Sequence, residues 1–289
     1  MKRIIKTLLL LLIIQITFAF DQKKLPKDAL IVAKDGSGKY KTVQAAINAL
    51  SSSANSERVI YIKNGTYKEQ VTINKNYVTL IGQNKDKVVI TYNLNNDKTG
   101  SSSECATVKV KADHFKAFEV TFENTSTFPC YQDTLLSYRG THYFKNCYIR
   151  GVTDFIWGAG RAVFDGCSLH IPQNGKKMAY ITANGNDDDK FKKGGFLITN
   201  SKVTVESGVN YYLGRLWKKN CYVIFNNTEL PGSQLNKAGW LTFRGHDNYK
   251  NTSKVGEYKC YGVNYSSAGR VSYVTKYTSV PSIKDFPWG

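Results

Sequence analysis

Two aspartates in this chain are spaced so that they could act together. Asp133 lies in residues 131–135 (YQDTL) and Asp154 in residues 154–158 (DFIWG), which places them 154 − 133 = 21 residues apart. That spacing is about one coil of a β-solenoid, in which neighbouring parallel strands lie about 4.8 Å apart. Two carboxyl groups this close cannot both ionise easily, so one serves as a general acid and the other as an anionic nucleophile. The alternative is that each aspartate simply occupies a turn or the surface.

A cation and an aromatic ring occur together in residues 213–217 (LGRLW). Arg215 can hold a carboxylate through two parallel hydrogen bonds, and Trp217 can stack on a sugar ring. A structural arginine packed on a core tryptophan would leave the same pattern. The sequence contains no Gly-x-Ser-x-Gly elbow, no His-Glu-x-x-His motif and no Cys-x-x-Cys pair. Neither a serine esterase nor a zinc site is therefore expected.

The elements that must position these residues are mostly short strands. Residues 43–50 carry apolar side chains at i, i+3, i+4 and i+7, which predicts one short helix. The runs 59–62, 78–81 and 88–90 are typical of buried strands.

A loose repeat follows residue 105, in which an aromatic residue is followed three positions later by a small or apolar residue and five later by an aliphatic one. Its copies are residues 115–120, 144–149, 164–169 and 225–230, with 198–203 as a weaker copy. This recurrence predicts an all-β, single-stranded, right-handed parallel β-helix with a short N-terminal capping helix. Cys147 and Cys167 would lie inside it, either paired or simply buried. A β-sandwich is the alternative, but its hairpin turns would be more evenly spaced.

Composition and the N-terminus indicate export. A basic start, an apolar run at 8–18 and a small-residue site near Ala19 predict a signal peptide over 1–19 and one domain over 20–289. An uncleaved anchor is the alternative, although the apolar run is short for a membrane span. Six cysteines and five Asn-x-Ser/Thr sequons fit an extracellular glycoprotein. For an exported protein, the net charge of +18 favours an acidic polysaccharide over nucleic acid as partner.

The motifs together carry a family resemblance. Residues 65–69 (GTYKE), 131–135, 154–158 and 213–217 resemble four signature segments of the pectin methylesterases, in the same order. Residues 35–38 (DGSG) and 79–82 (TLIG) are also similar to that family. The resemblance runs from about Ile31 to the region of Arg270 and implies a pectin lyase-like β-helix. It also implies a secreted cell-wall enzyme, a monomer without cofactor or metal, that acts on methylated pectin and has the acidic polysaccharide polygalacturonate as a further partner.

The resemblance further implies a role for each site residue. Asp154 would attack the C6 methyl ester of a galacturonate, and Asp133 would protonate the departing methanol and then activate water. Arg215 would orient Asp154, and Gln132 would donate a hydrogen bond to the oxyanion. The residues implied to line the sugar groove are Tyr131, Phe155, Trp157 and Trp217.

One departure from the family pattern concerns the chemistry. Between Asn124 and Tyr131 the family normally carries an extra coil, whose glutamine is a second oxyanion donor, and this chain passes directly from one segment to the next. The chain could therefore be a slow esterase, or a weak or inactive homologue that binds pectin. A β-helical pectate lyase is a third hypothesis, which the motifs disfavour.

Overall fold

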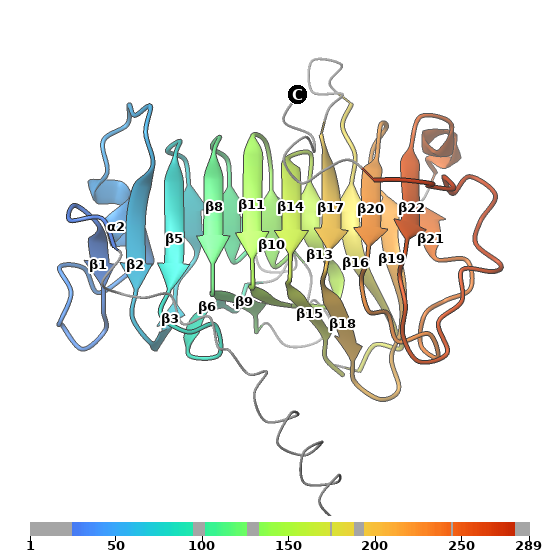
Figure 1. The fold of residues 1–289 in the computed structure, drawn as a ribbon, viewed down its shortest axis with the longest axis horizontal. Helices are drawn as coiled ribbons and strands as arrows, with labels where there is room; N and C mark the ends of the chain where they lie inside the picture. Colours follow the sequence, from blue (N-terminus) through green and yellow to red (C-terminus); the bar gives the residue numbers. More distant parts are fainter. Residues whose placement is uncertain are drawn as a thin grey trace, which may run out of the picture.

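The structure is a computed structural model that describes residues 25–94, 102–125, 133–173, 175–187, 194–243 and 245–280. Short strands pair in parallel and form three sheets, which wind into one solenoid with its strands side by side along the long axis (Figure 1). The predicted right-handed parallel β-helix is thus confirmed. Within the described residues, no helix is long and apolar enough to cross a membrane.

The strands belong to three sheets, A, B and C, and each coil adds one strand to a sheet. Sheet A contains β1 (Leu30–Val32), β2 (Arg58–Ile62), β5 (Val78–Gly82), β8 (Phe115–Phe118), β11 (Thr141–Lys145), β14 (Arg161–Asp165), β17 (Gly195–Thr199), β20 (Tyr222–Asn226) and β22 (Lys254–Tyr258). Sheet B contains β3 (Gly65–Lys68), β6 (Val88–Tyr92), β9 (Thr121–Asn124), β12 (Tyr148–Arg150), β15 (Ser168–Ile171) and β18 (Lys202–Val205). Sheet C contains β4 (Val71–Ile73), β7 (Val108–Val110), β10 (Leu135–Ser137), β13 (Thr153–Gly158), β16 (Met178–Asn184), β19 (Asn210–Leu216) and β21 (Trp240–Thr242).

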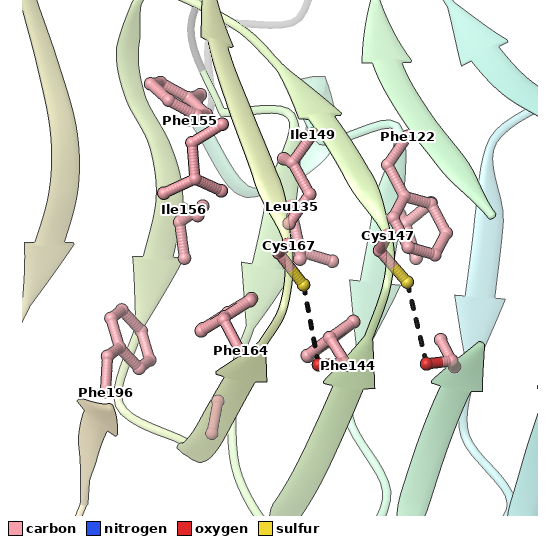
Figure 2. Close-up of a cluster of buried hydrophobic side chains, with 14 of the residues drawn as sticks. Phe122, Leu135, Phe144, Cys147, Ile149, Phe155, Ile156, Phe164, Cys167 and Phe196 are labelled. Atoms are coloured by element: carbon pink, nitrogen blue, oxygen red, sulfur yellow. Dashed lines mark hydrogen bonds between the residues drawn. The ribbon is translucent and has the colours of Figure 1, made fainter. Parts of the chain in front are cut away.

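The sequence repeat marks the corner between sheets A and B. Phe144 pairs with Phe164 in the next coil, their rings stack with centroids 4.8 Å apart, and both lie in the core (Figure 2). The register also corrects the predicted repeat, because the residue that pairs with Phe144 in the preceding coil is Ala117 and not Phe115. The predicted first copy was shifted by two residues, and that shift keeps the same face of a strand.

The chain turns the corner between sheets A and B through residues in the left-handed backbone conformation. Asn146, Gly166, Asn200 and Asn227 have φ values of 51°, 64°, 51° and 44°, and asparagine and glycine tolerate this region best. The amide of Asn227 donates to the side-chain oxygen of Asn200 in the neighbouring coil at 2.8 Å. Successive corners are therefore tied to one another by side chains as well as by the sheets.

The cysteines next to this corner are structural. Cys147 and Cys167 are buried, and each thiol donates to a carbonyl of the preceding coil, that of Ala117 at 3.6 Å and that of Phe144 at 3.5 Å (Figure 2). Neither forms a disulfide. Of the two alternatives for these residues, burial is the one observed.

The predicted helix caps the N-terminal end of the solenoid as α2 (Val43–Ala49). Thr42 accepts a hydrogen bond from the Ala45 amide, and the Glu69 carboxylate accepts from the amides of Val43 and Gln44 at 2.8 and 2.9 Å. A carboxylate at a helix N-terminus satisfies unpaired N–H groups and opposes the helix dipole. The glutamate of the GTYKE segment thus has a structural role. Among the described residues there are also the short helix α4 (Ser102–Cys105) and the 3₁₀ helix η3 (Asp247–Asn251).

Candidate active site

The two predicted carboxylates lie on neighbouring coils of sheet C. Strand β10 pairs with β13 in the register Leu135 to Ile156, and the amide of Asp133 donates to the carbonyl of Thr153 at 3.2 Å. This 21-residue offset places Asp133 beside Asp154, as the spacing predicted. The two residues are almost wholly buried, with 3% and 8% of their surface exposed.

Both aspartates adopt left-handed backbone conformations, with φ of 63° for Asp133 and 49° for Asp154. A side chain at such a φ is strained, although aspartate tolerates it better than most residues. At Asp154 the conformation accompanies a break in pairing, because three steps on β13, from Thr153 to Ile156, match two on β16, from Tyr180 to Thr182. An extra residue of this kind is a β-bulge, which redirects side chains beside functional sites.

The bulge also determines the direction in which the side chain of Phe155 points. In a regular strand, Phe155 would point to the face opposite Ile156, but both lie in the main core and Phe155 is fully buried (Figure 2). A β-carbon at Gly151 would come within 2.3 Å of the Phe155 β-carbon, so this inward ring needs a glycine there. The expectation that Phe155 lines a sugar groove therefore does not fit its position.

Arg215, on β19, forms an ion pair with Asp154 through two hydrogen bonds. Its Nε donates to one carboxylate oxygen at 3.0 Å and its Nη2 donates to the other. The side chains are 24% and 11% exposed, so this two-pronged ion pair is largely shielded from water. The predicted orienting role of Arg215 requires this geometry.

Burial and the neighbouring charges shift the pKa values of Asp154 and Arg215 in opposite directions. Burial raises the pKa of Asp154 above its ordinary value, and the hydrogen bonds and charge of Arg215 and the charge of Lys176 oppose that rise without cancelling it. Burial by itself would lower the pKa of Arg215, but Asp154 outweighs it and the pKa is raised, with Asp133 adding a smaller contribution. Asp154 thus lies in a poorly solvated place where its cationic neighbours limit the rise in its pKa.

The two predicted tryptophans meet beside this pair. Trp157 and Trp217 touch edge to face, with ring centroids 5.3 Å apart. They belong to a small apolar cluster that is separate from the main core and also contains Leu136, Ala183 and Ala106. Because Leu136 follows the core residue Leu135 on β10, this cluster covers the outer face of sheet C. Trp157 itself is only 6% exposed.

Two predicted residues, Tyr131 and Gln132, lie outside the described residues. Asn124, which like Thr125 or Ser126 could replace the missing glutamine donor if it lay near Asp133, is among the described residues. It is fully buried at the end of β9 in sheet B, and its amide donates to the Leu94 carbonyl at 3.1 Å. That position does not support a role for Asn124 beside Asp133.

Sequence reasoning missed three residues around Arg215 and Asp154. The Arg215 guanidinium carbon lies over the rings of Tyr180 and Phe243, 4.5 and 4.9 Å from their centroids. Lys176 contributes positive charge near Asp154. Tyr180 and Phe243 lie 35 and 28 residues from Arg215 in the sequence, and Lys176 lies 22 residues from Asp154. None of them shares a motif with its partner, so no local signal marked them, and the contacts arise only when coils stack. Within the described residues, no three His, Cys, Asp or Glu side chains gather as a metal site would require.

Comparisons with known proteins identify the family of this chain. The sequence model of the pectinesterase family matches residues 29–129 and 125–286, and the two matches meet in the connection between β9 and β10. Probable pectinesterase/pectinesterase inhibitor 17 of Arabidopsis thaliana is 33% identical over 281 residues, 87% of this chain and 54% of that protein. Pectinesterase 2 of Citrus sinensis is 31% identical over 277 residues, 86% of this chain and 54% of that protein. The chain thus spans about half the length of these two relatives.

Solved structures give the same result. The pectin methylesterase from carrot superposes with a TM-score of 0.72 at 28% identity, covering 86% of this chain and 88% of that one. The pectin methylesterase from Aspergillus niger superposes with a TM-score of 0.73 at 28% identity, covering 91% and 94%. With the family match extending over most of its length, this chain belongs to the pectinesterase family.

Proposed function

We propose that this protein hydrolyses the C6 methyl esters of pectin and releases methanol and pectate. The observation that carries the proposal is the two-pronged Arg215–Asp154 pair, one coil from the buried carboxyl of Asp133. The family membership and the carrot and Aspergillus niger structures support it.

The geometry suits a two-step acyl transfer. A carboxylate oxygen of Asp154 attacks the C6 carbonyl carbon, and the bond to the methoxy oxygen breaks as Asp133 gives that oxygen a proton, so methanol leaves. Water then loses a proton to Asp133 and attacks the same carbonyl carbon. The pectin carboxyl is released and Asp154 is restored as an anion. Arg215 keeps Asp154 ionised and aimed before attack.

We further propose that one coil of the usual family solenoid is missing and that turnover is slower for that reason. Strand β7 pairs directly with β10, and the family match is interrupted in the connection that precedes β10. With Gln132 as the one donor carried over from the family, the oxyanion would lose a partner. Removing one such donor costs roughly 10²–10³ in turnover in well-studied enzymes.

Methanol release from methylated pectin tests the proposal. We expect methanol and an equal amount of new carboxyl groups, without the ultraviolet-absorbing unsaturated products of a lyase. Binding to pectin without methanol release would instead support the inactive, pectin-binding alternative. A turnover number equal to that of the carrot enzyme would show that the oxyanion is fully stabilised without a second glutamine.

Export is part of the proposal. Residues 1–19, the proposed signal peptide, and the start of the 20–289 domain lie outside the described residues. The exposed asparagines at sequons, Asn64, Asn251 and Asn264, are the sites we propose for glycosylation if the source cell carries it out, whereas Asn124 is fully buried. We propose that the secreted protein acts as a monomer in a cell wall.

A further inference from the structure

Arg215 reaches Asp154 from a distance. In the register of sheet C, Arg215 pairs with Ala183, which pairs with Trp157, three residues beyond Asp154. Three residues of strand correspond to about 10 Å. The guanidinium must therefore extend back along the sheet and across β16 to meet the carboxylate. A long side chain in such a path has many rotamers, and its two hydrogen bonds to Asp154 fix only its tip.

Two aromatic rings lie under that path. The Tyr180 ring centroid is 4.5 Å from the guanidinium carbon and that of Phe243 is 4.9 Å away, both within the range of a cation–π contact. Tyr180 lies on β16, between the strands that carry Asp154 and Arg215, and its backbone pairs with Thr153. Phe243 follows β21, which pairs with β19 on the other side. The rings thus come from the strands on both sides of β19.

Tyr180 is itself held in place. Its ring stacks on that of Tyr212 in the next coil, with centroids 5.5 Å apart and planes 12° from parallel. The two residues pair in the register of β16 and β19. A ring supported in this way is a firm surface for the guanidinium.

We propose that Tyr180 and Phe243 are positioning residues that hold the Arg215 guanidinium in the orientation required to grip Asp154. The assignment rests on the proposed esterase function. An aromatic face attracts the cation without competing with Asp154 for its N–H donors, whereas a second carboxylate would compete. Two rings therefore fix the arginine and leave all of its hydrogen bonding for the nucleophile and the substrate.

The charges that surround Asp154 come from three elements, and the test must separate them. Arg215 comes from β19, Lys176 precedes β16 and Asp133 precedes β10. Tyr180→Leu and Phe243→Leu remove the ring face, keep most of the volume and change none of these charged groups. Tyr180→Phe keeps the ring and removes only the hydroxyl. Tyr148→Leu is a matched control, because Tyr148 stacks on His170 in sheet B, away from the site.

Two measurements follow on each folded variant. The first is the pH dependence of kcat and KM for methanol release, and the second is the pKa of Asp154 in the free protein by carbon NMR of labelled aspartate. We expect each leucine variant to raise the pKa of Asp154 by about one unit and to lower kcat on the acid limb about tenfold, with little change in KM. Tyr180→Phe and Tyr148→Leu should behave like the parent protein.

An unchanged Asp154 pKa and an unchanged kcat in both leucine variants would overturn the proposal. So would a rise in KM at constant kcat, which would make the rings sugar-binding residues. If the parent protein released no methanol, the proposed function would fail, and the NMR titration would still decide whether the rings position Arg215. Should one leucine variant not fold, the other provides the same comparison.

Discussion

At the scale of single residues, the proposed nucleophile is held in an unfavourable environment. Asp154 is buried and has a positive φ, and Arg215 holds both of its carboxylate oxygens. Backbone strain of this kind costs of order 1–3 kcal/mol and persists where the surrounding structure enforces it. Here β-sheet pairing on both sides of β13 provides that enforcement.

Replacing the nucleophile should abolish catalysis without unfolding the protein. Asp154→Asn keeps the size of the side chain but cannot form the covalent anhydride intermediate. We expect methanol release at least about 10³-fold below the parent, with an unchanged circular dichroism spectrum. Asp165→Asn, on the outer face of sheet A, is the control and should retain full activity. Near-normal turnover in folded Asp154→Asn would remove Asp154 from the central role.

The pH dependence of activity should reflect the opposing effects of burial and of Arg215 on the pKa of Asp154. Because burial raises the pKa of Asp154, the acid limb of kcat/KM should lie above the ordinary pKa of an aspartate. Arg215→Lys keeps the charge but loses the two-pronged bond, so the acid limb should move to still higher pH and kcat should fall about tenfold or more. Methanol release between pH 3 and 8 measures both effects, and a limb that moves to lower pH would contradict this account.

At the scale of elements, the strands of neighbouring coils are linked by buried polar groups. His142 on β11 is one of them. Its Nε2 donates to the carbonyls of Ala112 and Arg139 at 3.0 and 2.9 Å, and its Nδ1 accepts from the Ser137 hydroxyl at 2.7 Å. The ring is fully buried, and burial lowers its pKa from 6.5 to about 4. The folded protein therefore keeps this imidazole neutral.

This histidine should make the fold sensitive to acid. Between pH 6.5 and about 4 the unfolded chain binds a proton that the folded chain does not, so the contribution of His142 to stability is complete above pH 6.5 and declines as the pH falls through this range. The loss amounts to about 3 kcal/mol at most. Urea unfolding at pH 7 and pH 4.5 should show a smaller difference for His142→Gln than for the parent. The exposed His114→Gln variant should behave like the parent, and equal differences for all three proteins would rule out His142 as the source.

The capping helix provides a second test at this scale. Glu69→Ala removes the acceptor for two amides at the start of α2, which should cost about 1–2 kcal/mol in the free energy of unfolding. Thr66→Ala, an exposed substitution on the preceding strand β3, should cost little. Chemical unfolding measures both, with methanol release unchanged at low temperature. A loss of activity in folded Glu69→Ala would show that this glutamate does more than cap the helix.

At the scale of the whole molecule, stacked coils give a long surface and a large positive charge. Each coil contacts mainly its neighbours, so a solenoid tolerates the loss of a coil, whereas a site assembled from several coils loses the groups that the missing coil carried. The net charge of +18 attracts polyanions along the length of the molecule. That attraction should supply affinity for de-esterified pectin independently of catalysis.

Binding to pectate should therefore depend on salt. We expect retention on a polygalacturonate column at low ionic strength and release by roughly 0.2–0.5 M NaCl, where charges more than a few ångströms apart are screened. Asp154→Asn should elute with the parent, because its change in net charge is one part in eighteen. Retention that persists in 1 M NaCl would indicate a binding mode without a dominant electrostatic part.

Much of this protein could be predicted from its sequence because the relevant signals are local. The apolar face of α2, the buried strand runs and the corner repeat each lie within a few residues, and their physical meaning does not depend on distant contacts. The partnership of Asp133 and Asp154 followed from a spacing close to one coil. Arg215 was identified by the chemistry of its side chain and the motif around it.

Tertiary structure alone decided which way the side chains point and which coils meet. A strand alternates faces with period two, so the single extra residue at Asp154 places Phe155 in the core, and composition contains no sign of that bulge. The offsets from β13 to β16 and from β16 to β19 differ, 26 and 32 residues, because the intervening loops differ in length. The contacts of Arg215 with Tyr180 and Phe243 depend on those offsets. Stacking, which brings distant residues together through the sheet register, is therefore what assembled the site.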